Sequence, residues 1–146
     1  MSIPATSHRS PVQLAATVVG AVFLLVGVLG FIPGITSDAG SLGFAGHGSH
    51  AMLLGLFQVS VLHNIVHLLF GVAGLALARS AASAKGYLVW GGAIYLVLFV
   101  YGLVFSGDTA GNFVPVNAAD NGLHLILGIG MLVLGLALGR RTVARR

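Results

Sequence analysis

Two apolar stretches of this chain each carry a pair of residues that could bind a metal ion. His63 and His67 lie four positions apart in the first stretch, and Asp120 and His124 have the same spacing in the second. Residues four apart lie on the same face of a helix, one turn from each other. Three imidazoles and one carboxylate form a plausible tetrahedral ligand set for a divalent ion such as zinc or copper. These four residues are therefore a candidate divalent-metal site.

Further polar residues extend each pair and leave a simpler interpretation open. An asparagine follows the first member of each pair and could hydrogen-bond an imidazole to fix its orientation. A serine or an asparagine precedes each pair by three positions, where it could cap the helix, and the first member of the pair could complete that cap. The cluster could also be a structural network, because polar side chains that bridge membrane helices contribute about 0.6–2 kcal/mol each. The predicted polar cluster comprises Ser60, His63, Asn64, His67, Asn117, Asp120, Asn121 and His124.

A third interpretation uses only two of the histidines. His67 and His124 could be the axial ligands of a haem b, as in membrane cytochromes. Glycines on the same helix faces, at Gly71 and Gly128, argue against haem, because they favour close helix packing whereas a porphyrin holds its ligand helices apart. The structural network, the divalent metal and the haem are all kept as alternatives.

The composition predicts that helices in a membrane position these residues. The 146 residues are 57% hydrophobic and 7% charged, with a mean hydropathy of +1.01, whereas a soluble domain carries about 25% charged residues. Four apolar runs predict membrane-spanning helices at about 12–32, 60–78, 86–105 and 118–139. The absence of cysteine excludes thiolate catalysis and iron–sulfur clusters. The basic residues lie in tails and one loop, so they do not indicate nucleic-acid binding.

The distribution of Lys and Arg predicts the orientation. Arg9 precedes the first run, Arg79 and Lys85 lie between the second and third, and four arginines follow the fourth. The loops 33–59 and 106–117 contain no Lys or Arg and are therefore expected outside. This pattern predicts a multi-pass protein of the inner (cytoplasmic) membrane with both termini inside. It would have an N-terminal tail 1–11, a membrane domain 12–139 and a basic tail 140–146 that meets anionic headgroups.

The second and fourth runs indicate an internal repeat. Asn64 and His67 recur 57 positions later as Asn121 and His124. The first and third runs match more weakly, at about 74 positions, so the first outer loop would hold about 17 additional residues. Two consecutive two-helix repeats cross the membrane in the same direction and are related by an axis along its normal. We therefore expect an all-α four-helix bundle in which His67 and His124 face one another, about 10 Å below the outer boundary.

Two segments of the first outer loop bear on this site. Residues 51–58 are apolar but too short to cross the membrane, so we expect them at the interface or dipping into it. His47 and His50 could collect a metal for the inner site, but their glycine-rich surroundings favour solvated loop residues.

Two longer motifs carry a family resemblance. The stretches LFQVSVLHNIVHLLFGVAGLAL and FVPVNAADNGLHLILGIGML resemble the bacterial integral membrane family catalogued as domain of unknown function 4383. The resemblance covers roughly residues 12–139 and implies a small four-span membrane protein. It brings no established activity.

The sequence favours a protein that acts through contacts and not through catalysis. Asp120 is the only carboxylate within a predicted span, and below the two glycines both polar faces become apolar, which leaves no path across the membrane. We therefore expect a non-enzymatic accessory or interaction subunit, in contact with lipid and assembled as a homo-oligomer or within a larger membrane complex. The alternative is a metal- or haem-binding membrane protein that uses the polar cluster.

Overall fold

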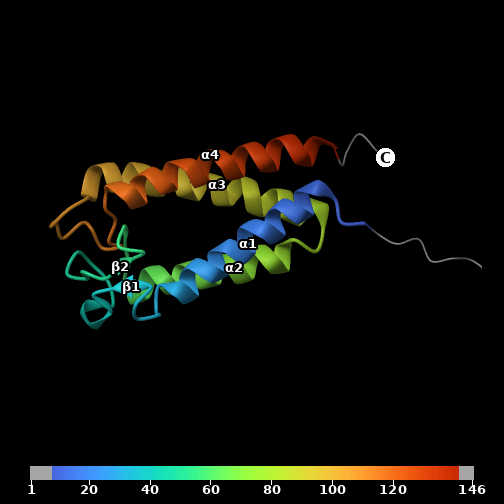
Figure 1. Cartoon of the computed structure of the whole chain (residues 1–146). Coiled ribbons are helices and arrows are strands. Elements are labelled where there is room, and N and C mark those ends of the chain that lie inside the picture. The colour runs from blue at the N-terminus through green and yellow to red at the C-terminus, as the bar shows by residue number, and fades with distance from the viewer. Residues whose placement is uncertain (1–7, 142–146) are drawn as a thin grey trace, which may run out of the picture.

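The computed structural model is a bundle of four helices with a small sheet at one end (Figure 1). It describes residues 8–141, and the side chains of residues 8–140; the remaining parts of both predicted tails lie outside the described residues. The elements in chain order are α1 (Pro11–Leu29), β1 (Thr36–Ser37), the 3₁₀ turn η1 (Ala39–Ser41), β2 (Met52–Leu53), β3 (Phe57–Gln58), α2 (Val61–Leu77), α3 (Ala81–Phe105) and α4 (Ala118–Arg141).

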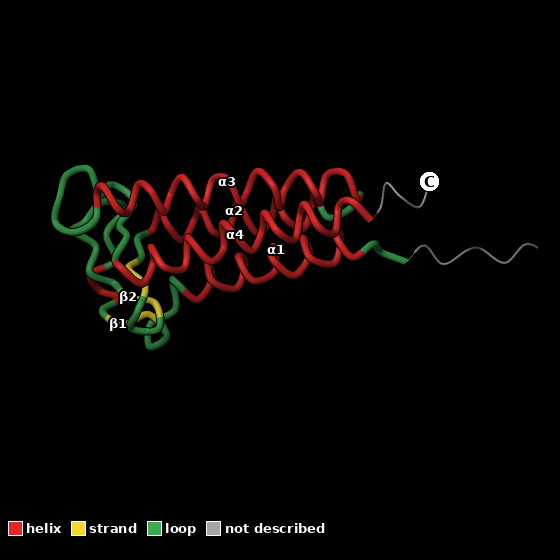
Figure 2. The backbone as a smooth tube through the Cα atoms, turned by 90° about the horizontal axis from the view of Figure 1, so that it is seen from above, coloured by secondary structure: helices red, strands yellow, loops and turns green. Residues whose placement is uncertain are grey.

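The four helices run up and down beside one another. Figure 1 shows that the start of α1, the turn between α2 and α3, and the end of α4 share one end of the bundle. The sheet and the two long connections occupy the other end, which we call the hairpin end (Figure 2). α1 packs mainly against α2, and α3 mainly against α4, so the bundle consists of two helix pairs. Gln13 joins the start of α1 to the end of α2, opposite the hairpin end. Its side-chain amide donates to the carbonyl oxygens of Ala78 (3.0 Å) and Arg79 (2.9 Å).

The two helix pairs make matching glycine contacts. A Cβ placed on Gly20 would lie 3.0 Å from the carbonyl oxygen of Gly71, and one placed on Gly92 would lie 2.8 Å from that of Gly128. Gly92 follows Gly20 by 72 positions, and Gly128 follows Gly71 by 57. The shift between the first helices of the two pairs is therefore 72 residues in these contacts and not the 74 expected from the sequence.

Three of the helices are long and apolar enough to cross a bilayer: α1, α3 and residues Ala118–Arg140 of α4. α2 has 17 residues, which at 1.5 Å each gives about 26 Å, slightly less than the roughly 30 Å of a hydrocarbon core. Large apolar side chains are exposed along all four helices, among them Leu14, Leu69, Val97 and Ile126. Such a surface is suited to lipid contact, and the chain is compatible with a membrane protein.

Two helices differ in extent from the predicted membrane spans. α3 begins at Ala81 and not at residue 86, because the hydroxyl of Ser80 accepts a hydrogen bond from the backbone N–H of Ser83 (3.2 Å) and caps the helix there. Lys85 consequently lies within α3, where its aliphatic stem packs at Gly139, and not in the loop as predicted. α1 ends at Leu29, three residues before the predicted end.

The first connection folds into a hairpin that covers the helix ends. β2 pairs antiparallel with both β1 and β3, with Leu53 opposite Thr36 on one side and Phe57 on the other. Leu54 and Gly55 make the turn with positive φ values of 55° and 68°. Leu53 is buried in a small core that includes residues at the end of α1. Residues 51–58 are therefore mostly a β-hairpin packed on the bundle.

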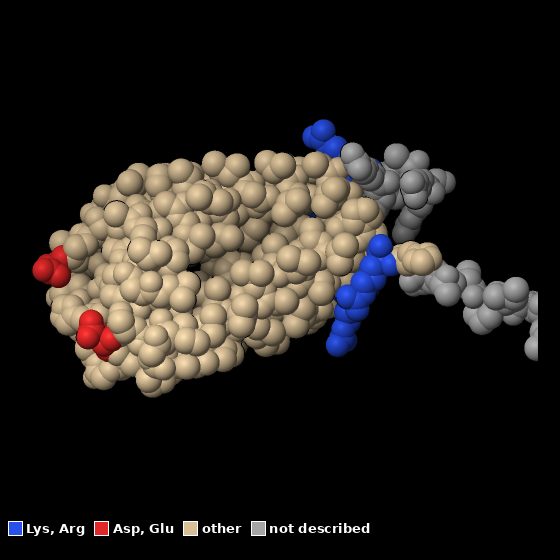
Figure 3. All heavy atoms as spheres, viewed as in Figure 1, with Lys and Arg blue, Asp and Glu red and all other residues tan. Residues whose placement is uncertain are grey.

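Charged residues are separated between the two ends of the molecule. Figure 3 shows Lys and Arg at the end where α1 begins and α4 ends, and acidic side chains at the hairpin end. The exposed acidic residues are Asp38 in the first connection and Asp108 in the second, whereas Asp120 is buried.

Candidate functional site: a histidine cavity beneath the hairpin

Two helix caps fix the direction in which the polar cluster points. The Ser60 hydroxyl accepts a hydrogen bond from the backbone N–H of His63 (3.1 Å) at the start of α2. At the start of α4, the Asn117 side chain accepts from the N–H of Asp120 (2.9 Å), and the Asp120 carboxylate accepts from the N–H of Asn117 (2.9 Å). Both capping residues are thus where the sequence placed them. Each cap lies three residues before the first member of its polar pair, so the two members of the pair lie on one helix face. That face is buried in both helices.

The structure brings three of the predicted histidines together from two helices. His63, His67 and His124 are 4%, 8% and 3% exposed. The ring centroids of His63 and His67 are 4.6 Å apart, and those of His63 and His124 are 6.3 Å apart. All three rings line one cavity, so the two polar groups, far apart in sequence, meet in the interior.

Each of these imidazoles has one ring nitrogen without a hydrogen-bond partner in the described part of the protein. The Nδ1 atoms of His63, His67 and His124 are buried without a partner, and so are both amide atoms of Asn64. A buried polar group without a partner destabilises a protein by about 1–3 kcal/mol. A closed hydrogen-bonded network therefore does not describe the histidines.

The histidines line a small cavity that the hairpin covers. Its volume is about 90 Å³, room for about three water molecules at roughly 30 Å³ each, or for one ion. Its polar wall consists of the three histidines and Asp120, and the remaining wall is apolar. Leu53, Leu54 and Phe57 of the hairpin contribute to that apolar wall. We call this space the histidine cavity.

Asp120 fastens the hairpin to α4. Its Oδ2 atom accepts hydrogen bonds from the backbone N–H groups of Gln58 (3.0 Å) and Asn117 (2.9 Å). The Asn117 side-chain amide donates to the carbonyl oxygen of Leu56 (2.8 Å). Two of these hydrogen bonds, with Gln58 and Leu56, therefore join the start of α4 to the hairpin.

The predicted four-ligand metal set is not assembled in this arrangement. Among residues 8–140, no group of three or more His, Cys, Asp or Glu side chains is already arranged to hold a metal ion. The Oδ2 atom of Asp120 instead accepts hydrogen bonds from the backbone N–H groups of Gln58 and Asn117. In this arrangement Asp120 stands in the cavity wall and fastens the hairpin, and its role as a fourth ligand stays a prediction.

The site does not fit a haem. The His63 ring lies against both His67 and His124, where a porphyrin between those two histidines would have to stand. A cavity of about 90 Å³ is also far smaller than the roughly 300–1,000 Å³ of pockets for larger ligands. The haem alternative is therefore withdrawn for this arrangement.

The two asparagines pack against the partner helix of their own pair. A Cβ placed on Gly30, at the end of α1, would overlap the Asn64 side chain, and one placed on Gly102 in α3 would overlap the Asn121 side chain. In the amide orientation that satisfies both groups, Asn121 donates to the carbonyl oxygen of Phe99 (3.1 Å) and accepts from the N–H of Leu103 (3.2 Å). Asn121 therefore binds the α3 backbone and does not orient an imidazole.

Two aromatic residues outside the predicted polar cluster contact its histidines. Phe23 of α1 stacks on His67 at 5.7 Å, and Tyr95 of α3 meets His124 edge-on at 5.3 Å. Phe23 and Tyr95 also stack on each other at 5.3 Å. Their positions differ by 72 residues, the same shift as the glycine contacts. A comparison of the sequence with itself at a shift of 72 residues is the signal that could have paired them.

The loop histidines do not join the cavity. His50 is exposed and His47 is half-buried, both in the first connection. Neither contributes to the wall of the histidine cavity. They serve as natural controls for experiments on the inner histidines.

Comparison with known proteins identifies the family. No curated protein and no solved structure matches this sequence. The family model described as domain of unknown function (DUF4383) matches residues 13–137, which include all four helices except their outermost residues. This match covers most of the chain, and the chain therefore belongs to that family.

Proposed function

We propose that this protein is a non-enzymatic accessory subunit of a membrane complex. In this proposal all four helices span the inner membrane, and both termini lie in the cytoplasm. The hairpin end then faces outward and the histidine cavity lies beneath the outer surface.

The topology is supported by charge and by helix pairing. The basic residues at Arg9, Arg79, Lys85 and Arg140 belong to the end of the bundle opposite the hairpin, which suits the cytoplasmic side. α2 runs alongside α1 and turns directly into α3 (Figure 1), so it crosses the same layer despite its shorter length. Matching residues lie 72 positions apart between α1 and α3, and 57 positions apart between α2 and α4. These two constant shifts support an origin by duplication of one helix pair.

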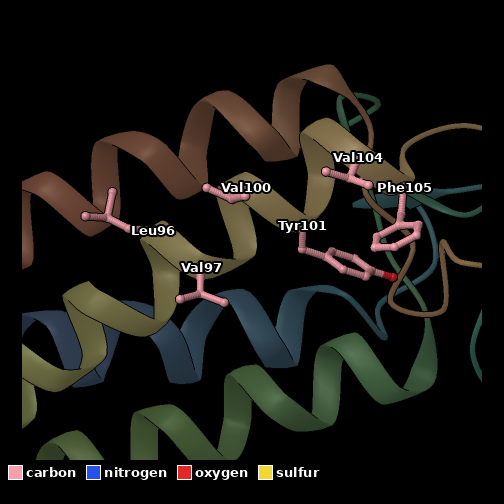
Figure 4. Close-up of a pocket in the computed structure, with 6 residues that line it drawn as sticks. All are labelled: Leu96, Val97, Val100, Tyr101, Val104 and Phe105. Atoms are coloured by element: carbon pink, nitrogen blue, oxygen red, sulfur yellow. The ribbon is translucent and has the colours of Figure 1, made fainter.

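The observation that carries the accessory role is an open apolar groove on α3. Its volume is about 480 Å³, and Figure 4 shows its lining side chains projecting from one stretch of the helix. The lining residues are Leu96, Val97, Val100, Tyr101, Val104 and Phe105. The stretch is about 14 Å long at 1.5 Å per residue, roughly half a membrane span. Val97, Val100 and Val104 remain 68%, 57% and 65% exposed.

This groove is suited to the side of another membrane-spanning helix. Membrane helices associate through close van der Waals packing, which an open groove of aliphatic side chains on one helix permits. Tyr101 adds rigidity at the hairpin end, because its hydroxyl donates to the carbonyl of Gly111 (2.6 Å) and accepts from the N–H of Phe113 (2.8 Å). We therefore propose an apolar helix of a different subunit as the occupant.

Site-specific photo-crosslinking in native membranes tests this function. A photoreactive residue at Val100 should form an adduct with one other membrane protein. The matched control is Ile126 on α4, which is 70% exposed and outside the groove, and it should give only lipid adducts. Lipid adducts alone at Val100 would contradict the accessory role, and adducts only between copies of this chain would replace it with a homo-oligomer.

A further inference from the structure

The ring nitrogens without hydrogen-bond partners support a second inference, which is independent of the groove on α3. We propose that the histidine cavity binds one divalent transition-metal ion, zinc or copper, through ring nitrogens of His63, His67 and His124. Asp120 supplies negative charge from the cavity wall.

The unpartnered nitrogen of His63 is its Nδ1 atom, which is buried without a hydrogen-bond partner. The Nδ1 atoms of His67 and His124 are buried without a partner in the same way. In neutral imidazole one ring nitrogen is a donor and the other an acceptor, and the acceptor nitrogen is the one that binds a metal ion.

The separations between the rings suit a shared ion. Zinc binds imidazole nitrogen at about 2.0–2.1 Å, which places two imidazole centroids around one tetrahedral ion about 5 Å apart. The observed separations of 4.6 Å and 6.3 Å lie on either side of that value. Residues 8–140 contain no preassembled group of three such ligands, so the rings must turn to share one ion. Imidazole χ2 is a broad torsion, so the rings can turn toward one ion without movement of the helices.

Cavity size and chemistry both favour a small cation over an organic ligand. The volume of about 90 Å³ is below the 150 Å³ or so of a cavity that accepts benzene. Imidazole is a preferred ligand of zinc and copper, and neutral rings leave the charge of the ion to be balanced by Asp120. Two or three water molecules would fill the same volume, so the experiment must distinguish an ion from water.

The test uses the full chain purified in detergent and treated with a chelator. Added Cu²⁺ should bind at one ion per chain and give an electron paramagnetic resonance spectrum with nitrogen couplings. Zn²⁺ should compete for the same site. His67→Ala and His124→Ala should each weaken copper binding at least tenfold and reduce the number of coupled nitrogens. His50→Ala, in the exposed loop, is the matched control and should leave both readouts unchanged.

Three outcomes would overturn the proposal. Absence of a stoichiometric ion in the wild-type chain would leave water as the occupant. Copper binding that survives in both inner variants but is lost in His50→Ala would place the site in the loop. An unchanged spectrum in His67→Asn and His124→Asn, which keep a polar group and are compared only when helix content by circular dichroism is native, would exclude imidazole ligation.

Discussion

At the scale of single residues, the interior of this protein depends on contacts between glycine and a polar side chain. Gly30 and Gly102 each leave the space that an asparagine of the neighbouring helix fills. For Asn121 this close approach also brings the amide within reach of the α3 backbone. The small residue and the polar residue are therefore one packing unit, and neither can change alone.

Substitution of one of these glycines should lower the stability of the protein, because the added methyl group would overlap the asparagine. Gly102→Ala places a methyl group on the Asn121 side chain, and we expect overpacking to lower the free energy of unfolding by about 1–3 kcal/mol. Gly86→Ala on the same helix meets nothing within 4 Å and should be neutral or stabilise by up to about 1 kcal/mol, as alanine is the better helix former. Denaturation followed by circular dichroism in detergent measures both. Equal stability of the two variants would contradict the packing argument.

At the scale of elements, the start of α4 controls the hairpin that covers the histidine cavity. Asn117 caps α4 and also binds the carbonyl of Leu56, and Asp120 binds the N–H of Gln58. Ser60 occupies the equivalent position on α2, but the hydrogen bond of its side chain is only the helix cap. The cap at Asn117 therefore has a second role, because it also fastens the hairpin in the connection between α1 and α2.

This difference predicts unequal effects of two otherwise similar substitutions. Asn117→Ala and Ser60→Ala should each lose about 1 kcal/mol of stability with the cap. Only Asn117→Ala should also free the hairpin, because it removes the bond to Leu56 and disturbs Asp120. Hydrogen exchange of residues 51–59, followed by mass spectrometry, should become faster in Asn117→Ala and remain near wild type in Ser60→Ala. The same exchange rate in both variants would show that the cap alone stabilises this region.

At the scale of the whole molecule, the two ends of the bundle differ in charge and in structure. The end with the termini carries the basic residues and a short turn, and the hairpin end carries the acidic residues and the longer connections. Transmembrane segments with basic residues at one end orient that end toward the cytoplasm. This asymmetry supports the proposed orientation for all four helices together.

Cysteine accessibility tests that orientation directly, because the chain has no cysteine of its own. Single cysteines at Ser37 and Asp108, both exposed at the hairpin end, should react with a membrane-impermeant maleimide in cells with a permeable outer layer. A cysteine at the exposed Arg79 should react only after the inner membrane is opened. Labelling of position 79 together with 37 and 108 would place α2 on one side of the membrane and rule out four spans.

Several features of the candidate site could be predicted from the sequence because they follow from local periodicity. His63 and His67 share a helix face whatever the tertiary packing, and Ser60 and Asn117 are favoured capping residues wherever a helix begins. The apolar runs likewise required helices, since in a membrane the backbone must satisfy its own hydrogen bonds. The predicted span begins later than α3, which starts at Ala81, because hydrophobicity and not the cap at Ser80 was used to place that span.

What only the tertiary structure decided is which groups meet across the chain and what remains unpaired. The sequence by itself determined the helices, their polar faces and the charge difference between the ends, because each is a property of neighbouring residues. It did not determine that the Asp120 Oδ2 atom accepts the Gln58 N–H, that Phe23 lies on His67, or that three imidazole nitrogens remain without partners. Those facts depend on distances between segments up to 62 residues apart, which are set by how the two helix pairs and the hairpin pack together.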